Sequence, residues 1–122
     1  MTTAVNPQRN IETLDEDAVR KCITGPGKSL VAYTSSDSYL WQIARPSFSS
    51  PEVLAEAERL NVNLGQVDIY SISPLLIAQE RISATPWFIA YQDGKRLGVS
   101  VDILPSQCYI DLLKRHFQES VK

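Results

Sequence analysis

The stretch from Ile82 to Lys95, ISATPWFIAYQDGK, constrains the fold more than any other part of the chain. Pro86 has no N–H group and a fixed φ angle, so it belongs at the start of a strand and not inside one. The apolar run Trp87–Tyr91 is then expected to form a buried strand. Asp93-Gly94 tolerates positive φ angles and predicts a tight turn. The segment 95–101 should return as the antiparallel partner of that strand.

The rest of the chain is expected to alternate strands and helices, because short apolar runs alternate with helix start and stop signals. Serine precedes proline at Ser50-Pro51 and at Ser73-Pro74, which is typical of a helix start. Pro46 should stop or kink a helix that reaches it. In chain order we expect a short edge strand around Ile11, a helix from Leu14 to Gly25, a strand over Lys28–Thr34, an interrupted helix from Ser36 or Asp37 to Leu60, a strand over Leu64–Ile69, a helix from Ser73 to Gln79, the hairpin, and a helix from Pro105 to about Glu119.

This order, βαβαβαββα, predicts one α/β domain with a mixed central sheet and helices on both faces. The sheet should be parallel in its first part and closed by the antiparallel hairpin. With 122 residues and 43% hydrophobic content, the chain can bury one such core. We assign residues 11–122 to this single domain. Residues 1–10 are polar and are expected to form a mobile N-terminal arm.

Charge and cysteine content exclude several classes of function. The net charge of -2 gives no general attraction to phosphate backbones, so no nucleic-acid partner is expected. No apolar stretch approaches the roughly 20 residues needed to cross a bilayer, and no signal peptide is recognisable, so we expect no membrane contact and a cytoplasmic or nuclear location. Cys22 and Cys108 lie far apart in the sequence and fit neither a secreted disulfide framework nor a zinc site. No metal or cofactor is predicted.

The chain around the predicted hairpin resembles the thioredoxin family. Thr85-Pro86, the strand that follows, Asp93-Gly94 and the last helix match the corresponding family features, and the resemblance spans roughly residues 14–117. It implies a thioredoxin-like fold with a cis peptide bond between Thr85 and Pro86. In that family the cis-proline lies beside the redox site and presents backbone groups to an extended peptide.

The redox motif of that family is replaced at the matching positions. Thioredoxins carry Cys-x-x-Cys between the second strand and its helix, where the helix N-terminus stabilises a thiolate. Counting back from Pro46, which matches the family's helix proline, places these cysteines at Ser38 and Trp41. The motif therefore reads Ser38-Tyr39-Leu40-Trp41. A hydroxyl and an indole cannot exchange disulfides, so we expect no dithiol chemistry and no catalytic residue at this site.

Three further positions that surround the redox pair in the family are also replaced. The buried carboxylate falls on Ala32, the tryptophan before the first cysteine on Asp37, and the glycine of the last strand on Asp102. The scaffold signals remain while the catalytic groups are missing. This combination favours a binding or structural role over catalysis.

No other nucleophile or redox pair is predicted. Ser38 is interpreted as a helix-capping residue, because no base is evident nearby and His116 belongs to the far helix. His116 is interpreted as a helix-end residue, favoured by the helix dipole. Cys22 and Cys108 should lie on opposite faces of the sheet, beyond the reach of a disulfide. Cys108 is interpreted as an inert, half-buried thiol.

The candidate binding site is an apolar and aromatic surface beside the predicted cis-proline. The resemblance implies that Tyr39, Leu40 and Trp87 flank a peptide-binding groove. Aromatic side chains suit recognition, because they bury a large area with few rotors to fix. The alternative is that Trp41 and Trp87 pack inward and fill the space of the missing carboxylate and thiol. The candidate binding residues are Tyr39, Leu40, Trp41, Thr85, Pro86, Trp87 and Asp102.

Three functions are compatible with these features. The first is a redox-inactive thioredoxin-like protein that binds a protein or peptide, or a second copy of itself as a homodimer. The second is a thiol-dependent oxidoreductase or glutathione-related enzyme that uses the displaced Cys108. The third is a structural subunit of an assembly. We favour the first, because a peptide-binding surface can persist without a thiol in it.

Overall fold

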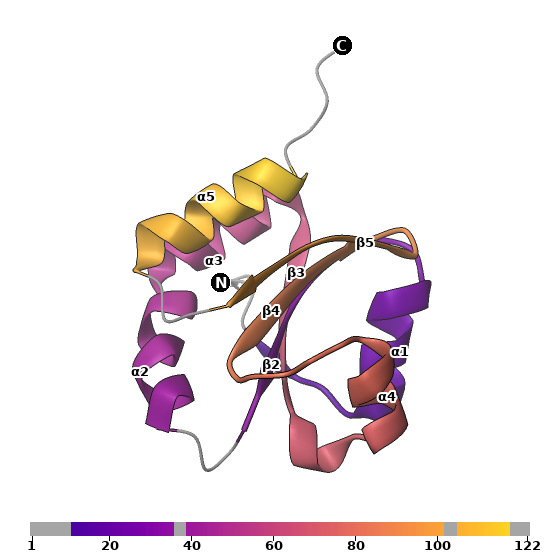
Figure 1. Cartoon of the computed structure of the whole chain (residues 1–122). Coiled ribbons are helices and arrows are strands. Elements are labelled where there is room, and N and C mark those ends of the chain that lie inside the picture. Colours follow the sequence, from indigo (N-terminus) through magenta and orange to yellow (C-terminus); the bar gives the residue numbers. More distant parts are fainter. Residues whose placement is uncertain (1–10, 36–38, 102–104, 118–122) are drawn as a thin grey trace, which may run out of the picture.

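The computed structural model describes residues 11–35, 39–101 and 105–117, which form a five-stranded sheet with helices on both faces (Figure 1). The strands are β1 (Glu12–Thr13), β2 (Lys28–Thr34), β3 (Val62–Asp68), β4 (Trp87–Gln92) and β5 (Lys95–Val101). The helices are α1 (Glu16–Thr24), α2 (Tyr39–Phe48), α3 (Pro51–Leu60), α4 (Pro74–Gln79) and α5 (Ser106–Phe117), with a short 3-10 helix, η2, at Ile69–Ser71. The predicted α/β architecture is confirmed.

Strand β2 is the centre of the sheet, whose order is β1-β3-β2-β4-β5. It pairs in parallel with β3 and antiparallel with β4, so that Ala32 lies between Gln66 and Phe88. The parallel pair needs a crossover, which α2 and α3 provide. The short β1 adds to the outer edge of β3, and β5 returns antiparallel to β4.

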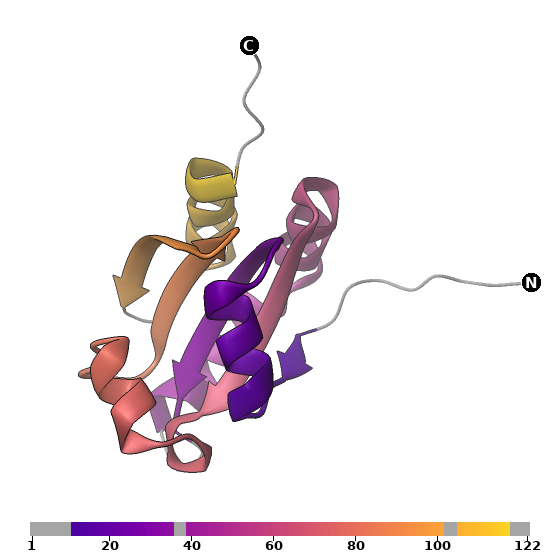
Figure 2. The same ribbon diagram turned by 90° about the vertical axis from the view of Figure 1, so that its right-hand side faces the viewer.

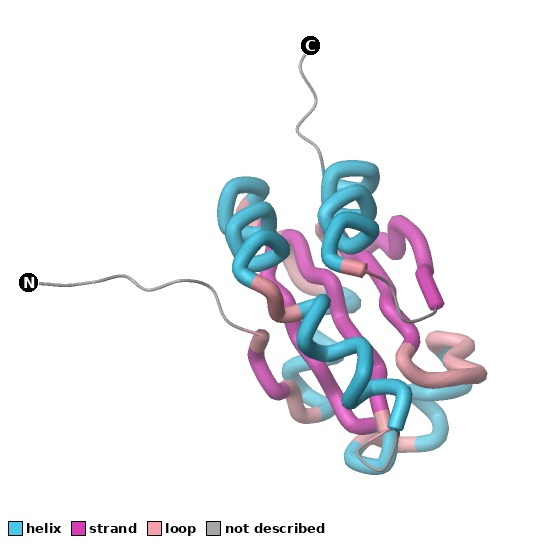
Figure 3. The backbone as a smooth tube through the Cα atoms, turned by 90° about the vertical axis from the view of Figure 1, so that its left-hand side faces the viewer, coloured by secondary structure: helices cyan, strands magenta, loops and turns pink. Residues whose placement is uncertain are grey.

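The helices form two layers, one on each side of the sheet. Helices α2, α3 and α5 lie side by side on one face, and α1 and α4 cover the other (Figures 1, 2 and 3). Alternate side chains of β2 contribute to both cores. Leu30 and Ala32 pack on the α2/α3/α5 face, whereas Val31 and Tyr33 pack on the α1/α4 face. This is why the strand reads as an uninterrupted apolar run in the sequence.

Short polar side chains begin three of the helices. Asp15, Ser50 and Ser73 accept hydrogen bonds from backbone N–H groups in the first turns of α1, α3 and α4. A proline follows the serine directly in α3 and α4, where its missing N–H costs no helical bond. Helix α3 ends at Asn61, whose φ of 60° lies in the left-handed region. The predicted starts of α3 and α4 are confirmed.

Helix α2 continues through Pro46 to Phe48, beyond the point where the proline was expected to stop or kink it. Trp41 and Phe48 lie on one buried face of this helix, so packing on the sheet holds its last turn although Pro46 donates no hydrogen bond. The hydroxyl and the backbone N–H of Ser49 both donate to the Arg45 carbonyl, at 2.7 and 2.9 Å. These bonds end the helix, and α3 begins two residues later.

The β4–β5 hairpin closes on the turn predicted for it. Asp93 and Gly94 have φ angles of 52° and 82°. The carboxylate of Asp93 accepts a hydrogen bond from the Gly27 N–H at 2.9 Å, and the Asp93 N–H donates to the Gly27 carbonyl at 3.0 Å. The turn is therefore fixed to the loop between α1 and β2 as well as to its own strands.

Strand β3 differs from the expectation at both ends, and helix α1 begins at Glu16 and not at Leu14. Strand β3 begins at Val62, two residues before the predicted start at Leu64, because the ladder with β2 extends to the pair of Lys28 and Val62. Ile69 belongs to η2 and not to the strand. The predictions for the arm at 1–10 and for Asp37, Ser38 and Asp102 lie outside the described residues.

Candidate functional site

Three large apolar side chains of helix α2 are exposed to solvent. Tyr39 is 73% exposed, Leu40 46% and Ile43 42%. Tyr39 and Ile43 are four residues apart and so lie one above the other on the helix. We call these three residues the α2 ridge. Tyr39 and Leu40 are among the predicted binding residues, and Ile43 is not, although its helical spacing from Tyr39 places it on the same face.

Trp41 is a core residue, unlike the ridge residues on either side of it. Only 8% of it is exposed, and its ring lies 6.0 Å from that of Phe48 and 6.4 Å from that of Phe88, measured between centroids. Tyr109 of α5 extends this aromatic cluster. Ala32 lies in the same core. Of the two alternatives for Trp41, inward packing is the one that the structure shows.

The Thr85–Pro86 peptide bond is cis, as the resemblance implies. Pro86 is buried and Thr85 is partly exposed, directly before β4. The ring contact between Trp41 and Phe88 brings the first turn of α2 against the start of β4. The α2 ridge and the cis peptide bond therefore lie at the same end of the sheet (Figure 1).

Trp87 packs on the opposite face of the sheet from Trp41. It pairs with Tyr33 across the β2–β4 ladder and contacts the α1/α4 core while remaining partly exposed. Its indole Nε1 is buried, and no hydrogen-bond partner for it exists in the part of the chain that the structure describes. The two tryptophans therefore do not form one aromatic surface.

A buried hydrogen-bond network holds the segment between α4 and β4 that contains the cis peptide bond. Glu80, at the end of α4, is 6% exposed and accepts a hydrogen bond from the Tyr91 hydroxyl at 2.6 Å. The Tyr33 and Tyr91 hydroxyl oxygens are 2.7 Å apart. Arg96 donates to the Glu80 backbone carbonyl at 2.8 Å, and its guanidinium lies 3.7 Å from the carboxylate. Strands β2, β4 and β5 thus share one anchor at this end of α4.

Both tyrosines in this network are neutral and act as hydrogen-bond donors. Burial raises the pKa of Tyr33 and of Tyr91 well above the usual tyrosine range. The Tyr33 hydroxyl and the acceptor Glu80 act in the same direction on the pKa of Tyr91. Because the Tyr91 hydroxyl donates its one hydrogen bond to Glu80, the hydrogen bond between the two tyrosines must be donated by Tyr33.

The two cysteines are free and do not meet. Cys22 lies in α1 and Cys108 in the first turn of α5, and these helices cover opposite faces of the sheet (Figure 1). Both side chains are partly buried. Burial raises the pKa of the Cys22 thiol, which lowers its thiolate fraction. Neither thiol belongs to α2, where the resemblance places the second thiol of the redox pair, at Trp41.

His116 lies in the last turn of α5, as expected, and its ring packs over Gly98 of β5. A Cβ atom at position 98 would come within 2.7 Å of the imidazole Nε2, so the glycine makes room for the ring. Burial, and then the positive charge of Arg115, lower the pKa of His116. The helix dipole was expected to favour the charged imidazole, and here desolvation outweighs it.

Within residues 11–35, 39–101 and 105–117, no group of three or more His, Cys, Asp or Glu side chains could hold a metal ion. In the same ranges no helix is long and apolar enough to cross a membrane.

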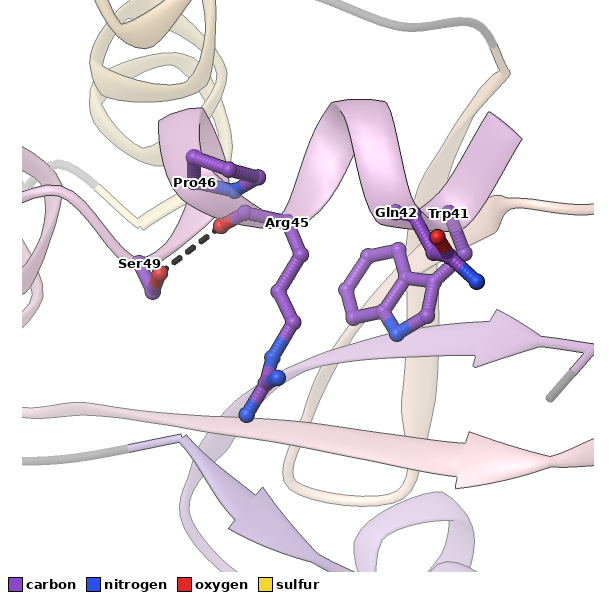
Figure 4. A pocket seen from close by; sticks show the side chains of 5 residues that line it. All are labelled: Trp41, Gln42, Arg45, Pro46 and Ser49. Carbon is purple, nitrogen blue, oxygen red and sulfur yellow. Dashed lines mark hydrogen bonds between the residues drawn. The ribbon is translucent and has the colours of Figure 1, made fainter. Parts of the chain in front are cut away.

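An open pocket of about 440 Å³ lies against α2 (Figure 4). By helical geometry it adjoins the row formed by Tyr39 and Ile43 and faces away from Leu40. Its lining residues are Trp41, Gln42, Arg45, Pro46 and Ser49. The walls combine an indole edge with a guanidinium, a carboxamide and a hydroxyl group. Apart from Trp41, none of these residues was predicted to belong to a site, because no sequence motif connects them.

Comparisons with known proteins identify the fold. No family profile matches the sequence, and no curated protein matches it. Among solved structures, a thioredoxin from Malassezia sympodialis superposes with a TM-score of 0.75 at 15% identity, covering 92% of this chain and 95% of that chain. A mutant thioredoxin from Halobacterium salinarum gives 0.73 at 13% identity, covering 98% of this chain and 100% of that one.

A third similar chain comes from a structural study of the thiol-resolving mechanism in yeast mitochondrial 1-Cys peroxiredoxin via the glutathione and thioredoxin systems. It has a TM-score of 0.67 at 16% identity, covering 88% of this chain and 93% of that chain. At such identities a likeness shows the fold alone. The chain has a thioredoxin fold, with the cis X-Pro bond next to the first turn of α2.

Proposed function

We propose that this chain is a thioredoxin-fold protein without dithiol–disulfide exchange activity, which binds a protein or peptide through the α2 ridge and the backbone beside Thr85 and Pro86. The observation that carries the proposal is the exposure of Tyr39 and Leu40 at the start of α2, next to the cis peptide bond. Exposed apolar side chains that gather on one element are a mark of interaction surfaces.

Binding at this surface would combine two kinds of contact. A partner segment in extended conformation can form hydrogen bonds with the backbone around Thr85, and it can bury apolar area on Tyr39 and Leu40. Tyrosine is a strong anchor, because its rigid ring buries a large area and keeps a polar tip at the edge. Truncating such an anchor typically costs about 2 kcal/mol or more of binding free energy.

The proposed lack of redox activity rests on the residues around α2. The resemblance places the second thiol at Trp41, whose indole is instead part of the aromatic core. The two cysteines of the chain lie in other helices, on opposite faces of the sheet. A dithiol pathway would need two thiols within bonding distance.

An insulin-reduction assay tests the redox part of the proposal. With dithiothreitol as reductant and a known thioredoxin as positive control, we expect this protein to precipitate insulin no faster than dithiothreitol alone. Catalysed reduction that disappears in the Cys108→Ser variant would refute the proposal. It would support the alternative, an enzyme that uses the partly exposed thiol of Cys108.

Binding is tested separately with surface variants that leave the core intact. A pull-down from native cell extract with wild-type protein should retain partners that Tyr39→Ala and Leu40→Ala lose. Leu75→Ala is the matched control, because Leu75 is 72% exposed on α4, on the other face of the sheet. Light scattering on the purified protein distinguishes a homodimer, which the same two variants should dissociate. Equal retention by wild type and both ridge variants would remove the α2 ridge from the binding site.

A further inference from the structure

Helix α2 has two different surfaces on its solvent side. The α2 ridge is apolar, whereas the pocket beside it combines polar and apolar groups in about equal measure (Figure 4). Gln42 and Pro46 of the pocket are three residues beyond Tyr39 and Ile43 of the ridge, so the two rows are neighbours on the helix. A chain that lies across the helix can therefore contact both.

The pocket contains the single charged residue of α2. The helix, YLWQIARPSF, has no acidic residue, and Arg45 is its only basic one. Arg45 is exposed, and among the described residues no acidic side chain forms an ion pair with it. Figure 4 shows its side chain extending from the helix toward the same side as the Trp41 indole. A guanidinium offers five N–H donors in a fork that fits a carboxylate.

Two of the lining residues, Gln42 and Pro46, are four positions apart in α2. Pro46 has no N–H, so the Gln42 carbonyl lacks the donor that a regular helix would provide. The Gln42 side chain adds an amide that can both donate and accept. The Ser49 hydroxyl donates to the Arg45 carbonyl at 2.7 Å and retains acceptor capacity.

We propose that this pocket binds a carboxylate of the partner polypeptide, either an Asp or Glu side chain or a chain end, while the α2 ridge binds an adjacent apolar residue. The inference rests on the proposed function and specifies the chemistry of the partner. Arg45 holds the carboxylate, and the Gln42 carbonyl accepts a backbone N–H of the same segment.

A polypeptide suits this site better than a free small acid. Pockets that retain small molecules bury most of the ligand surface, whereas this pocket is open and lies on the outside of one helix. A carboxylate in it stays partly hydrated and contributes little affinity alone. A peptide adds the apolar contact with the neighbouring ridge, which is exposed at Tyr39 and Ile43.

The test begins with selection of random linear peptides from a display library on the intact wild-type protein. We expect the selected peptides to carry Asp or Glu close to an apolar residue. One selected peptide and its amide analogue, with Gln or Asn for the acid, are then titrated against wild type and Arg45→Gln. Each single change should weaken binding about ten-fold, and both together should weaken it little further, because they remove the same contact.

Further variants and one small-molecule probe distinguish a failure of this inference from a failure of the proposed function. Arg115→Gln, an exposed arginine of α5, should leave affinity unchanged, and Arg45→Lys should restore only part of it. If the losses of affinity from Arg45→Gln and from the amide analogue add up, the two changes do not remove the same contact. That result would overturn this inference but would leave the proposed binding at the α2 ridge intact. A library that yields no binder overturns both. If N-acetylglutamate binds as tightly as the peptide, the polypeptide partner is refuted and a free carboxylate takes its place.

Discussion

Replacement of Trp41 by alanine should destabilise the fold strongly, whereas replacement of Tyr39 should not. The two residues are two positions apart on α2, yet Trp41 is 8% exposed and Tyr39 is 73% exposed. The Trp41 ring contacts Phe48 of its own helix and Phe88 of β4. It therefore couples α2 to the strand that follows the cis peptide bond.

The size of the effect follows from this packing. Truncation of a buried tryptophan to alanine typically costs about 3–5 kcal/mol. Alanine is the better helix former, which returns about 0.5 kcal/mol. We expect Trp41→Ala to lower the free energy of unfolding by about 3 kcal/mol, a large part of the stability of an ordinary domain. Tyr39→Ala, at an exposed site, should change it by about 0.5 kcal/mol or less.

Equilibrium urea unfolding followed by far-UV circular dichroism measures both values. Circular dichroism is preferable to fluorescence, because Trp41 is one of two tryptophans in the chain. Trp41→Phe serves as the intermediate control and should recover more than half of the loss, since phenylalanine keeps a ring against Phe48 and Phe88. The slope of unfolding against urea should be the same in all variants if unfolding remains two-state.

Two results would refute this reasoning. A loss of less than about 1 kcal/mol for Trp41→Ala would mean that the indole is not part of the core. A comparable loss for Tyr39→Ala would mean that the exposed ring stabilises the helix, and it would remove the reason for assigning Tyr39 to recognition.

Other predictions concern titration and the hairpin turn. The raised pKa values of Tyr33 and Tyr91 contribute stability that is fully present below the usual tyrosine pKa of about 10. The free energy of unfolding should therefore fall as the pH rises above 10, by at most about 1.4 kcal/mol per pH unit for each tyrosine. The fall should be less steep in Tyr33→Phe. The lowered pKa of His116 affects stability at acidic pH, because the unfolded chain binds the proton more readily than the folded one. The urea midpoint should therefore decrease as the pH falls below about 6.5, and His116→Gln should reduce this dependence. Asp93→Ala should lower the free energy of unfolding, measured with urea, by about 1–2 kcal/mol, since it removes the acceptor for the Gly27 N–H and leaves alanine at positive φ. Asp93→Asn should lower it much less.

The parts of the fold that the sequence predicts are those with local physical signals. Asp93-Gly94 can adopt the two positive φ angles that the hairpin turn requires. Ser50 and Ser73 cap the helices that they were expected to start. The apolar run Lys28–Thr34 identifies the central strand, because both of its faces are covered. Each of these signals acts within a few residues and needs no knowledge of distant contacts.

The side-chain directions at the candidate site were harder to predict. Trp41, Ala44 and Phe48 follow helical spacing and are all buried, so periodicity alone favours the inward position of Trp41. The resemblance associates that position with the redox site beside the peptide-binding groove, so both orientations of Trp41 were kept as alternatives. Trp87 is one residue from Phe88 and faces the other side of the sheet, as strand alternation requires.

The Glu80 network and the pocket beside α2 could not be predicted from the sequence. Glu80, Tyr91, Tyr33 and Arg96 come from a helix end and three strands, and only the folded sheet brings them together. Glutamate at position 80 would ordinarily be interpreted as a solvated surface residue. The pocket depends on the directions of long side chains such as Arg45, which sequence patterns do not specify.

The two parts of the proposed binding surface are held by separate anchors on opposite faces of the sheet. The aromatic cluster around Trp41 positions α2 and its ridge, while the hydrogen bonds of Glu80 position the segment that leads to the cis peptide bond. A surface fixed in advance loses less conformational entropy on binding, so a partner can be held by fewer contacts. The exposed residues Tyr39, Leu40 and Arg45 lie outside both anchors and can change without loss of the fold. Recognition and stability are therefore separable in this chain, and variants of the exposed residues should alter partner choice at nearly constant stability.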